Sequence, residues 1–288
     1  MPELPEVETV RRGLSPFMVG ARLIQVEARR PDLRFPFPAN FVDRLTGAHI
    51  AALDRRGKYL TAALSTGETL IMHLGMSGRF SVTDETSDAR PGSFYFAPVT
   101  NPCHDHVRFV VQGERGHSQI VFNDPRRFGF MDIEPTSTLG SSAHFAGMGP
   151  EPLAAEFTAD ALRLRLDGRS APLKSVLMDQ SAVAGLGNIY VCEALWRARL
   201  SPRRRAGSVS AASSCRLHRA IREVLLEAID AGGSTLRDFA RSDGSKGYFQ
   251  HHFSVYGREG EPCPACSAPV RRFVQGGRST FACLKCQR

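Results

Sequence analysis

Four cysteines near the end of the chain have the spacing of a metal site. Cys263-x2-Cys266 and Cys283-x2-Cys286 are separated by sixteen residues. Each CxxC turn offers two thiolates to one zinc ion, and a hairpin between them, with strands 270–275 and 278–282, brings the pairs together. Disulfides are the alternative, which a reducing cytosol disfavours. Because protein would fill all four positions, no site remains for a catalytic water, and we expect one structural Zn²⁺ per chain.

The N-terminus offers a second kind of chemistry. Pro2 follows the initiator Met1, so removal of Met1 would turn the Pro2 nitrogen into a free secondary amine. Such an amine can attack a sugar C1′ and form a Schiff base. Glu3 and Glu6 stand within one helical turn of it, available as proton donor and as positioner of the amine. The alternative is that Pro-Glu simply begins a helix well.

Composition bounds the class of protein. The 288 residues suffice for two domains, and 42% of them are hydrophobic. A net charge of +8, with eight arginines and no acid between Arg197 and Arg222, indicates a polyanionic partner or else a solvated basic face. No apolar run is long enough to span a membrane, and no secretion leader is visible, so we expect a cytoplasmic protein. The remaining cysteines, Cys103, Cys192 and Cys215, are expected to be structural thiols.

Hydrophobic periodicity predicts an α+β protein of two domains. A helix over 5–18 precedes about eight β-like runs between 21 and 134, which suggests a β-sandwich or open barrel with one docked helix and a surface insertion at 81–103. Further on, helices at 173–179 and 188–199 flank a turn at 180–187, and an amphipathic helix covers 217–229. We therefore expect a catalytic domain at 1–134, a linker at 135–152, a helical domain at 153–250 and a zinc finger at 251–288.

Several motifs together carry a resemblance to a known family. They run in order along nearly the whole chain: Pro2-Glu-Leu-Pro-Glu, Lys58-Tyr-Leu, His73-Leu-Gly-Met-Ser-Gly, His104-Asp-His-Val, Asp124-Pro-Arg-Arg-Phe-Gly, Gly149-Pro-Glu-Pro-Leu, Gly185-Leu-Gly-Asn-Ile-Tyr, Ser242-Asp-Gly with Gly247-Tyr-Phe, and the zinc finger. The set resembles the formamidopyrimidine-DNA glycosylases. The resemblance implies a β-sandwich domain followed by a helical domain with a helix–two-turn–helix motif and a zinc-finger hairpin.

The resemblance also implies catalytic roles. Pro2 would be the Schiff-base nucleophile, and Glu3 the acid that protonates the opening sugar. Lys58 would donate a proton and contact phosphate during β-elimination, and Arg278 would assist δ-elimination. Without the family, Lys58 is equally a solvated strand lysine. Glu6 stays the expected positioner of the amine.

DNA contacts follow from the same resemblance. Met76, Arg126 and Phe128 would fill the void left by a flipped base, and Arg126 would pair with the cytosine that has lost its partner. Core packing is the alternative for the two apolar side chains. The remaining implied contacts are with the DNA backbone: Asn188 at a helix start, His104, and either Arg169 or Lys174. A His104-x-His106 metal pair is the rival interpretation for His104.

These residues lead to one expected function. The chain is expected to be a monomeric glycosylase and abasic-site lyase that acts on damaged double-stranded DNA and removes oxidised purines such as 8-oxoguanine. An endonuclease VIII-like enzyme for oxidised pyrimidines is one alternative, although Pro2-Glu-Leu-Pro-Glu and an apparent capping loop at 242–249 favour the purine branch. A non-catalytic zinc-ribbon protein that binds nucleic acid is the other.

Overall fold

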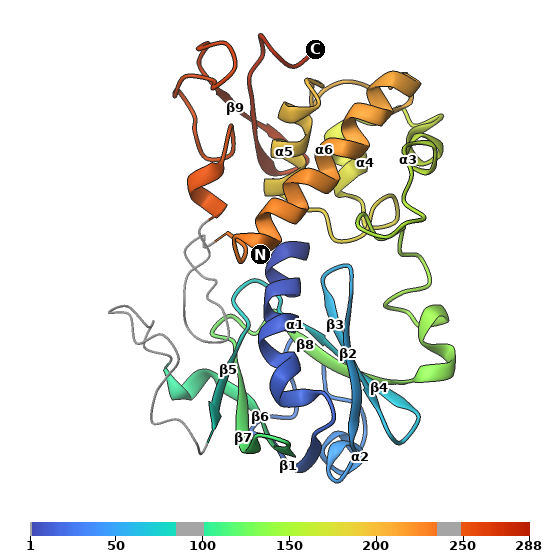
Figure 1. Ribbon diagram of the computed structural model, residues 1–288, viewed down its shortest axis with the longest axis vertical. Coiled ribbons are helices and arrows are strands. Elements are labelled where there is room, and N and C mark those ends of the chain that lie inside the picture. The colour runs from blue at the N-terminus through green and yellow to red at the C-terminus, as the bar shows by residue number, and fades with distance from the viewer. Residues whose placement is uncertain (1, 85–100, 235–248) are drawn as a thin grey trace. The chain divides into compact units, whose positions relative to one another are not determined.

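The computed structural model describes residues 2–84, 101–234 and 249–288. The chain divides into two compact units: Met1–Ala146 with Ala231–Tyr248, and Gly147–Asp230 with Phe249–Arg288. We call them the N-terminal unit and the C-terminal unit (Figure 1). The domain boundaries expected from the sequence remain a prediction. Within the described residues, no helix has the length and apolarity to cross a membrane.

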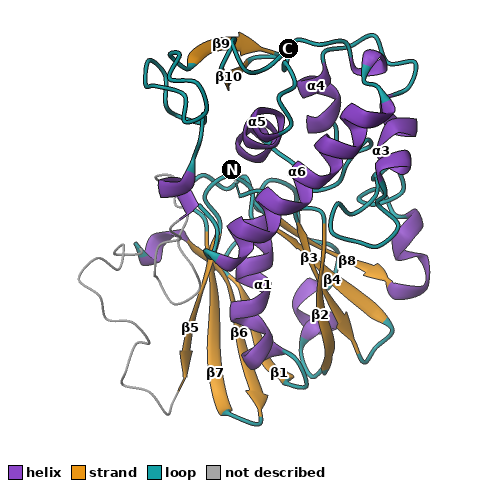
Figure 2. Cartoon of the chain, turned by 45° about the horizontal axis from the view of Figure 1, so that its top comes forward, coloured by secondary structure: helices purple, strands orange, loops and turns teal. Residues whose placement is uncertain are grey.

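The N-terminal unit contains two four-stranded antiparallel sheets (Figure 2). The first has the order β1-β6-β7-β5, and the second has the order β2-β3-β4-β8. The strands are β1 (Arg22–Ala28), β2 (Ile50–Arg56), β3 (Tyr59–Leu64), β4 (Glu68–His73), β5 (Arg79–Asp84), β6 (Asp105–Gly113), β7 (Gly116–Asn123) and β8 (Phe130–Pro135). Shorter elements are α2 (Phe41–Leu45), η1 (Pro102–His104) and η2 (Thr136–Ser141).

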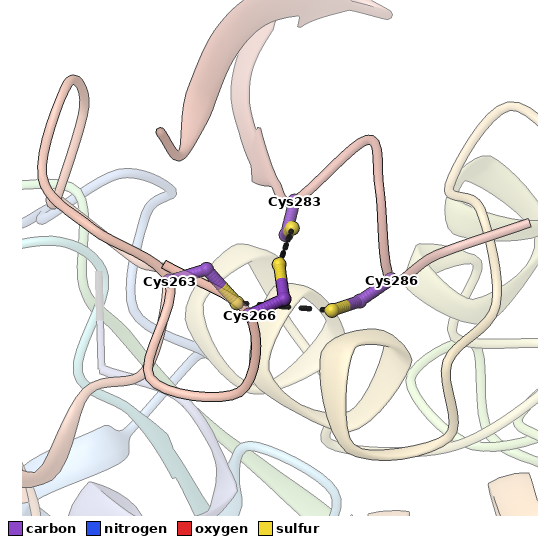
Figure 3. Close-up of side chains that lie close together, drawn as sticks. All are labelled: Cys263, Cys266, Cys283 and Cys286. Atoms are coloured by element: carbon purple, nitrogen blue, oxygen red, sulfur yellow. Dashed lines mark hydrogen bonds between the residues drawn. The ribbon is translucent and has the colours of Figure 1, made fainter. Parts of the chain in front are cut away.

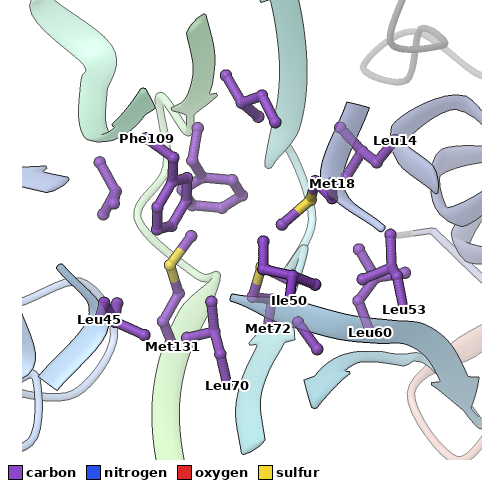
Figure 4. Close-up of a cluster of buried hydrophobic side chains, with 14 of the residues drawn as sticks. Leu14, Met18, Leu45, Ile50, Leu53, Leu60, Leu70, Met72, Phe109 and Met131 are labelled. Carbon is purple, nitrogen blue, oxygen red and sulfur yellow. The ribbon is translucent and has the colours of Figure 1, made fainter. Parts of the chain in front are cut away.

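Helix α1 (Leu4–Met18) packs against strands of both sheets. Its buried stripe includes Val7, Val10, Leu14 and Met18, at the spacing of one helical face. These side chains join one apolar core with residues of both sheets, among them Phe109 (Figure 4). The core fixes α1, and therefore the chain's first residues, relative to the strands.

The C-terminal unit is helical, with a small hairpin. Its helices are α3 (Ala159–Leu166), α4 (Leu173–Met178), α5 (Asn188–Arg197) and α6 (Ala211–Asp230), with short turns η3 (Ala206–Ser208) and η4 (Phe249–His252). Strands β9 (Arg271–Gln275) and β10 (Arg278–Ala282) form the hairpin. Helices α4 and α5 flank the turn 179–187, which is the helix–two-turn–helix arrangement. The expected α+β fold, with two domains and a zinc-finger hairpin, is confirmed.

Two details of the sequence prediction are wrong. Residues 81–84 are not part of a surface insertion, because they continue strand β5, where Ser81 pairs with Val121 and Val82 with Ile120. Their polar character reflects an edge strand with one face toward solvent. The helix expected to reach residue 199 ends at Arg197, because Arg199 takes the left-handed conformation (φ 56°). Residues 85–100 of the expected insertion lie outside the described residues.

Candidate active site and zinc centre

The start of α1 holds two buried carboxylates in a defined geometry. Glu3 and Glu6 form a capping box, in which the Glu6 backbone N–H donates to the Glu3 carboxylate and the Glu3 N–H donates to Glu6 Oε2 (2.9 Å). Pro2 is buried beside them. Glu6 Oε1 accepts hydrogen bonds from the backbone N–H (2.8 Å) and Oγ (2.9 Å) of Ser234. Glu6 therefore acts as an anchor that fixes the backbone at Glu3.

A glycine makes this anchor possible. Gly233 has a φ of +83°, and a Cβ built on it would lie 3.2 Å from Glu6 Oε1. A side chain here would strain the backbone and crowd the carboxylate at the same time. Gly232-Gly233, which the sequence marks only as the end of a helix, therefore also shapes the pocket for Glu6.

Lys58 lies in the tight turn between β2 and β3 and is only 7% exposed. The turn is tied to α1 by Arg55, which donates to Gly57 O (3.0 Å) and pairs with Glu8 (3.4 Å). Burial raises the pKa of Glu8, but hydrogen bonds from Arg11 and Arg12 outweigh it and hold that pKa below its usual value. This cluster was not predicted, although Glu8 and the two arginines three and four residues later form i, i+3 and i, i+4 charge pairs that are visible in the sequence.

The proposed void-filling residues lie on two loops that are clamped together. Asp124 is fully buried; its carboxylate accepts from Ser77 Oγ (2.5 Å) and from Gly129 N–H (2.8 Å). Gly75 comes so close to the second loop that an added Cβ would lie 2.3 Å from Gly129 N. The packing of one backbone on the other gives both loop tips a fixed geometry.

At the tips, the side chains face solvent and not the core. Phe128 is 43% exposed, and the Arg126 guanidinium lies 4.8 Å from the centre of its ring. Met76 is half-buried beside them. With His73 and Arg34, these residues line a hollow of about 640 Å³. Core packing therefore does not explain Phe128.

His73 ends strand β4 at the floor of this hollow. Its Nδ1 accepts from the Gly75 N–H (3.1 Å), so the neutral ring carries its proton on Nε2. Burial, followed by the positive charges of Lys58 and Arg34, lowers the pKa of His73 to about 4. The imidazole is therefore uncharged at neutral pH and offers one N–H. His73 stands in the motif His73-Leu-Gly-Met-Ser-Gly, but no role for it was predicted from the sequence.

His104 lies at the end of η1 and is half-buried. His106, two residues later, is buried with its Nε2 2.9 Å from the Asp124 carbonyl oxygen. Neither belongs to any group of three potential metal ligands in the described part of the chain. The geometry therefore gives the metal-pair interpretation of His104 no support.

In the C-terminal unit, the turn before α5 is braced by its own side chains. Gln180 accepts from the Gly185 N–H (2.9 Å) and donates to Leu186 O (2.9 Å). Asn188, the first residue of α5, donates from Nδ2 to Ser279 O of β10 (2.9 Å). The helix–two-turn–helix motif and the hairpin are therefore joined at Asn188.

Arg169 and Lys174 have opposite surroundings. Arg169 is exposed between α3 and α4. Lys174 is 1% exposed, and its Nζ donates to Thr280 Oγ1 (2.7 Å) and to Ser279 O (3.2 Å). Arg278 is exposed at the start of β10. The apparent capping loop at 242–249 falls, except for Phe249, outside the described residues.

Several arginines of the basic run make contacts within the protein. Arg197 pairs with Glu227 through both guanidinium nitrogens, and Arg222 donates to the carbonyl oxygens of Pro152 and Ala154. Arg203 lies over the Phe273 ring at 3.9 Å. The sequence shows the charge of this run but not these partners, which are distant along the chain.

The four cysteines form a compact cluster whose ligand atoms all lie within 4.8 Å of one another (Figure 3). Cys263 Sγ lies 3.9 Å from Cys286 Sγ, and Cys266 Sγ lies 3.4 Å from Cys283 Sγ. Four sulfurs at about 2.3 Å from a tetrahedral zinc are about 3.8 Å apart, so the cluster fits the ion. Burial raises the pKa of the Cys263 thiol, but hydrogen bonds from Trp196 and the Ala265 backbone outweigh it and bring that pKa to about 6.

Comparison with known families covers both units. Residues 1–131 match the formamidopyrimidine-DNA glycosylase N-terminal domain, residues 148–240 match the H2TH domain of that enzyme, and residues 260–288 match the zinc finger found in FPG and IleRS. The chain belongs to the formamidopyrimidine-DNA glycosylase family. Membership confirms the DNA glycosylase class and the structural zinc ion expected from the sequence.

Individual relatives agree over their full length. Formamidopyrimidine-DNA glycosylases from Chelativorans sp. and Rhodopseudomonas palustris are 55% and 54% identical, with all of each chain covered. The crystal structure of the MutM (FPG) protein from Thermus thermophilus matches with a TM-score of 0.84 at 42% identity, over 99% of this chain and 98% of that one. A Lactococcus lactis FPG mutant bound to Fapy-dG containing DNA matches with a TM-score of 0.85 at 34% identity, over the whole of both chains.

Proposed function

We propose that this chain excises oxidised purines from duplex DNA through a Schiff base on Pro2 and then cuts the abasic strand by β,δ-elimination. The observation that carries the proposal is the geometry at the start of α1. Pro2 directly precedes a buried capping box, in which Glu3 is 4% exposed and Glu6 is anchored to Ser234. A capping box is a common helix start, but it does not require Glu6 also to accept two hydrogen bonds from a distant segment.

The chemistry follows from these groups. Once Met1 is removed, the Pro2 nitrogen attacks C1′, the bond from C1′ to the base breaks, and the base leaves with the bond's electron pair and the proton that the amine gives up. Glu3 protonates O4′ as the sugar ring opens, which leaves an iminium ion at C1′. Loss of a C2′ proton then expels the 3′ phosphate. Lys58 supplies a proton and contacts phosphate at this stage, and Arg278 assists loss of the 5′ phosphate.

The loops and the C-terminal unit supply the DNA contacts. Arg126 and Phe128 are exposed on clamped loops, which suits side chains that enter a duplex and replace a flipped base. Met76 accompanies them. We assign Asn188 and His104 to the DNA backbone. Arg169 takes the contact that the sequence left open, because it is exposed.

The substrate class rests on the relatives. They carry the formamidopyrimidine name, and the Lactococcus lactis structure holds Fapy-dG containing DNA. The family name of these relatives favours the purine branch over the endonuclease VIII alternative, and an enzyme over a zinc-ribbon binding protein. We further propose that the chain acts as a monomer in the cytoplasm; sedimentation of the free and DNA-bound protein tests the first point.

Borohydride trapping tests the nucleophile. Wild-type protein should form a covalent adduct with an oxidised-guanine duplex, whereas a form that retains Met1 should form none, because its Pro2 nitrogen is an amide. Glu3→Gln should lower base excision by orders of magnitude and keep part of the lyase action on a preformed abasic duplex. Lys58→Ala should lose mainly rate on damaged bases or strand cleavage.

Glu114→Gln is the matched control, because Glu114 is an exposed acid in the turn between β6 and β7. It should trap and cleave like wild type. If the Met1-retaining protein traps at wild-type yield, the nucleophile is a lysine, Lys58 first, and Pro2-Glu3 is only a helix start.

A further inference from the structure

Helix α5 and the zinc-finger hairpin are joined by more than packing. Glu193, in the middle of α5, is fully buried and accepts three backbone N–H bonds, from Ser254 (2.9 Å), Val255 (3.0 Å) and Tyr256 (2.8 Å). The segment 254–256 leads directly toward Cys263. A carboxylate that satisfies three donors fixes this segment to the helix, because breaking the set would leave buried polar groups unpaired.

The second cysteine knuckle is attached to the residues that follow α5. The Gln287 side chain accepts from Cys283 N–H (2.8 Å) and donates to Leu200 O (3.0 Å). Ser201 N–H donates to Arg288 O (3.0 Å). With Asn188 bound to β10 at the other end of the helix, residues 254–288 contact α5 at its start, in its middle and just beyond its end.

One of these attachments reaches a metal ligand itself. The Trp196 indole N–H donates to Cys263 Sγ across 3.3 Å, and the half-buried ring packs in the apolar cluster that contains Cys263 and Cys283. Trp196 is the only tryptophan in the chain. An N–H donor on a zinc-bound thiolate stabilises the sulfur's charge, and groups of this kind around metal ligands orient the ligands and tune the site.

We propose that Trp196 is an outer-shell donor to the zinc-bound Cys263 thiolate, which slows zinc release and couples metal occupancy to the position of α5. Trp196, the donor of this bond, is in the same helix as Asn188, which binds the hairpin. Trp196 is therefore a positioning residue. Its indole emission should also report whether the site is filled, because a thiolate in contact with the ring quenches it to a degree that the metal changes.

The sharpest test changes one group of atoms. Because Trp196 is the only tryptophan, a tryptophan auxotroph grown on 3-benzothienylalanine replaces the indole N–H by sulfur at this position alone and keeps the two-ring shape. Loss of an outer-shell partner typically lowers metal affinity by about tenfold or more, so zinc release to a chromogenic chelator should become about tenfold faster or more. In the cobalt-substituted protein, the sulfur-to-metal charge-transfer band should move to lower energy. Trp196→Phe should behave in the same way.

Phe281→Leu is the matched control. Phe281 packs in the same cluster, with its ring 5.0 Å from that of Tyr256. The variant should leave the charge-transfer band in place even where looser packing speeds zinc release. If the benzothienyl protein keeps the wild-type band and release rate, the proposal is overturned. It is also overturned if Trp196 emission stays constant while a chelator removes all the zinc from the wild-type protein.

Discussion

The variant Lys174→Met tests whether Lys174 stabilises the C-terminal unit or binds DNA. The side chain is buried, and its ammonium donates to Thr280 Oγ1 and Ser279 O. Methionine keeps the aliphatic stem and removes the charge. Ser279 O retains the Asn188 bond, but the fully buried Thr280 hydroxyl loses its partner. A hydrogen bond to a charged group contributes about 1.5–3 kcal/mol, and Thr280 is the group left without a partner, so we expect a loss of about 1.5–3 kcal/mol in the unfolding free energy of the C-terminal unit.

The assay has two readouts. Urea unfolding of the zinc-loaded protein measures stability, and the salt dependence of DNA binding counts phosphate contacts. Each phosphate neutralised contributes about 0.9 to the slope of log K against log salt. Lys174→Met should leave the slope unchanged, because its ammonium is engaged within the protein. Arg169→Ala, the matched variant, should lower the slope by about one contact at unchanged stability. The reverse pattern, with stability intact and the slope reduced in Lys174→Met, would refute the reasoning.

Other predictions concern separate sites. Because the pKa of His73 is lowered to about 4 in the folded protein, His73 of the unfolded chain takes up a proton at a higher pH than His73 of the folded chain. Wild type should therefore lose up to about 3 kcal/mol of stability as the pH falls from 6.5 to 4. His73→Gln should show a flatter urea-midpoint profile there, and an equal profile would contradict the assignment. Cys283→Ser should lose zinc by elemental analysis and bind DNA weakly while the N-terminal unit stays folded; freshly purified wild type without zinc would refute this. Arg126→Ala should relax the preference for cytosine opposite the lesion in cleavage assays, and unchanged selectivity would remove Arg126 from that role.

Features with local signatures were predictable from the sequence. Helix α1 was predictable because Val7, Val10 and Leu14 recur at the period of an α-helix and form its buried face. The hairpin was predicted to within one residue from the CxxC spacing and from Gly276-Gly277 at its tip. Both signals lie within a short stretch of the chain. Pro2 and Glu3 drew attention through the resemblance, because a proline and an acid at a helix start are common by themselves.

The sequence does not reveal hydrogen-bond partners that only the tertiary structure brings together. Glu193 lies among buried, mostly apolar neighbours in the middle of α5, and its three donors come about sixty residues later with no spacing that marks them. Lys174 looks like an exposed base at a helix start until β10 covers it. Ser234 gives no hint that it binds Glu6, 228 positions earlier. In each case the burial of a polar side chain is decided by a distant segment.

The burial of Pro2 and Glu3 has a consequence for biosynthesis. Helix α1 takes its fixed position only when the sheets it packs against exist, and the last strand of that core ends at Pro135. Ribosomes add roughly 5–20 residues per second, so about ten seconds pass between the synthesis of the N-terminus and the synthesis of this strand. We expect Met1 to be removed in that interval, before the N-terminus is fixed against the sheets. On the proposed mechanism, a chain that folds with Met1 in place would recognise damaged DNA and have no amine with which to react.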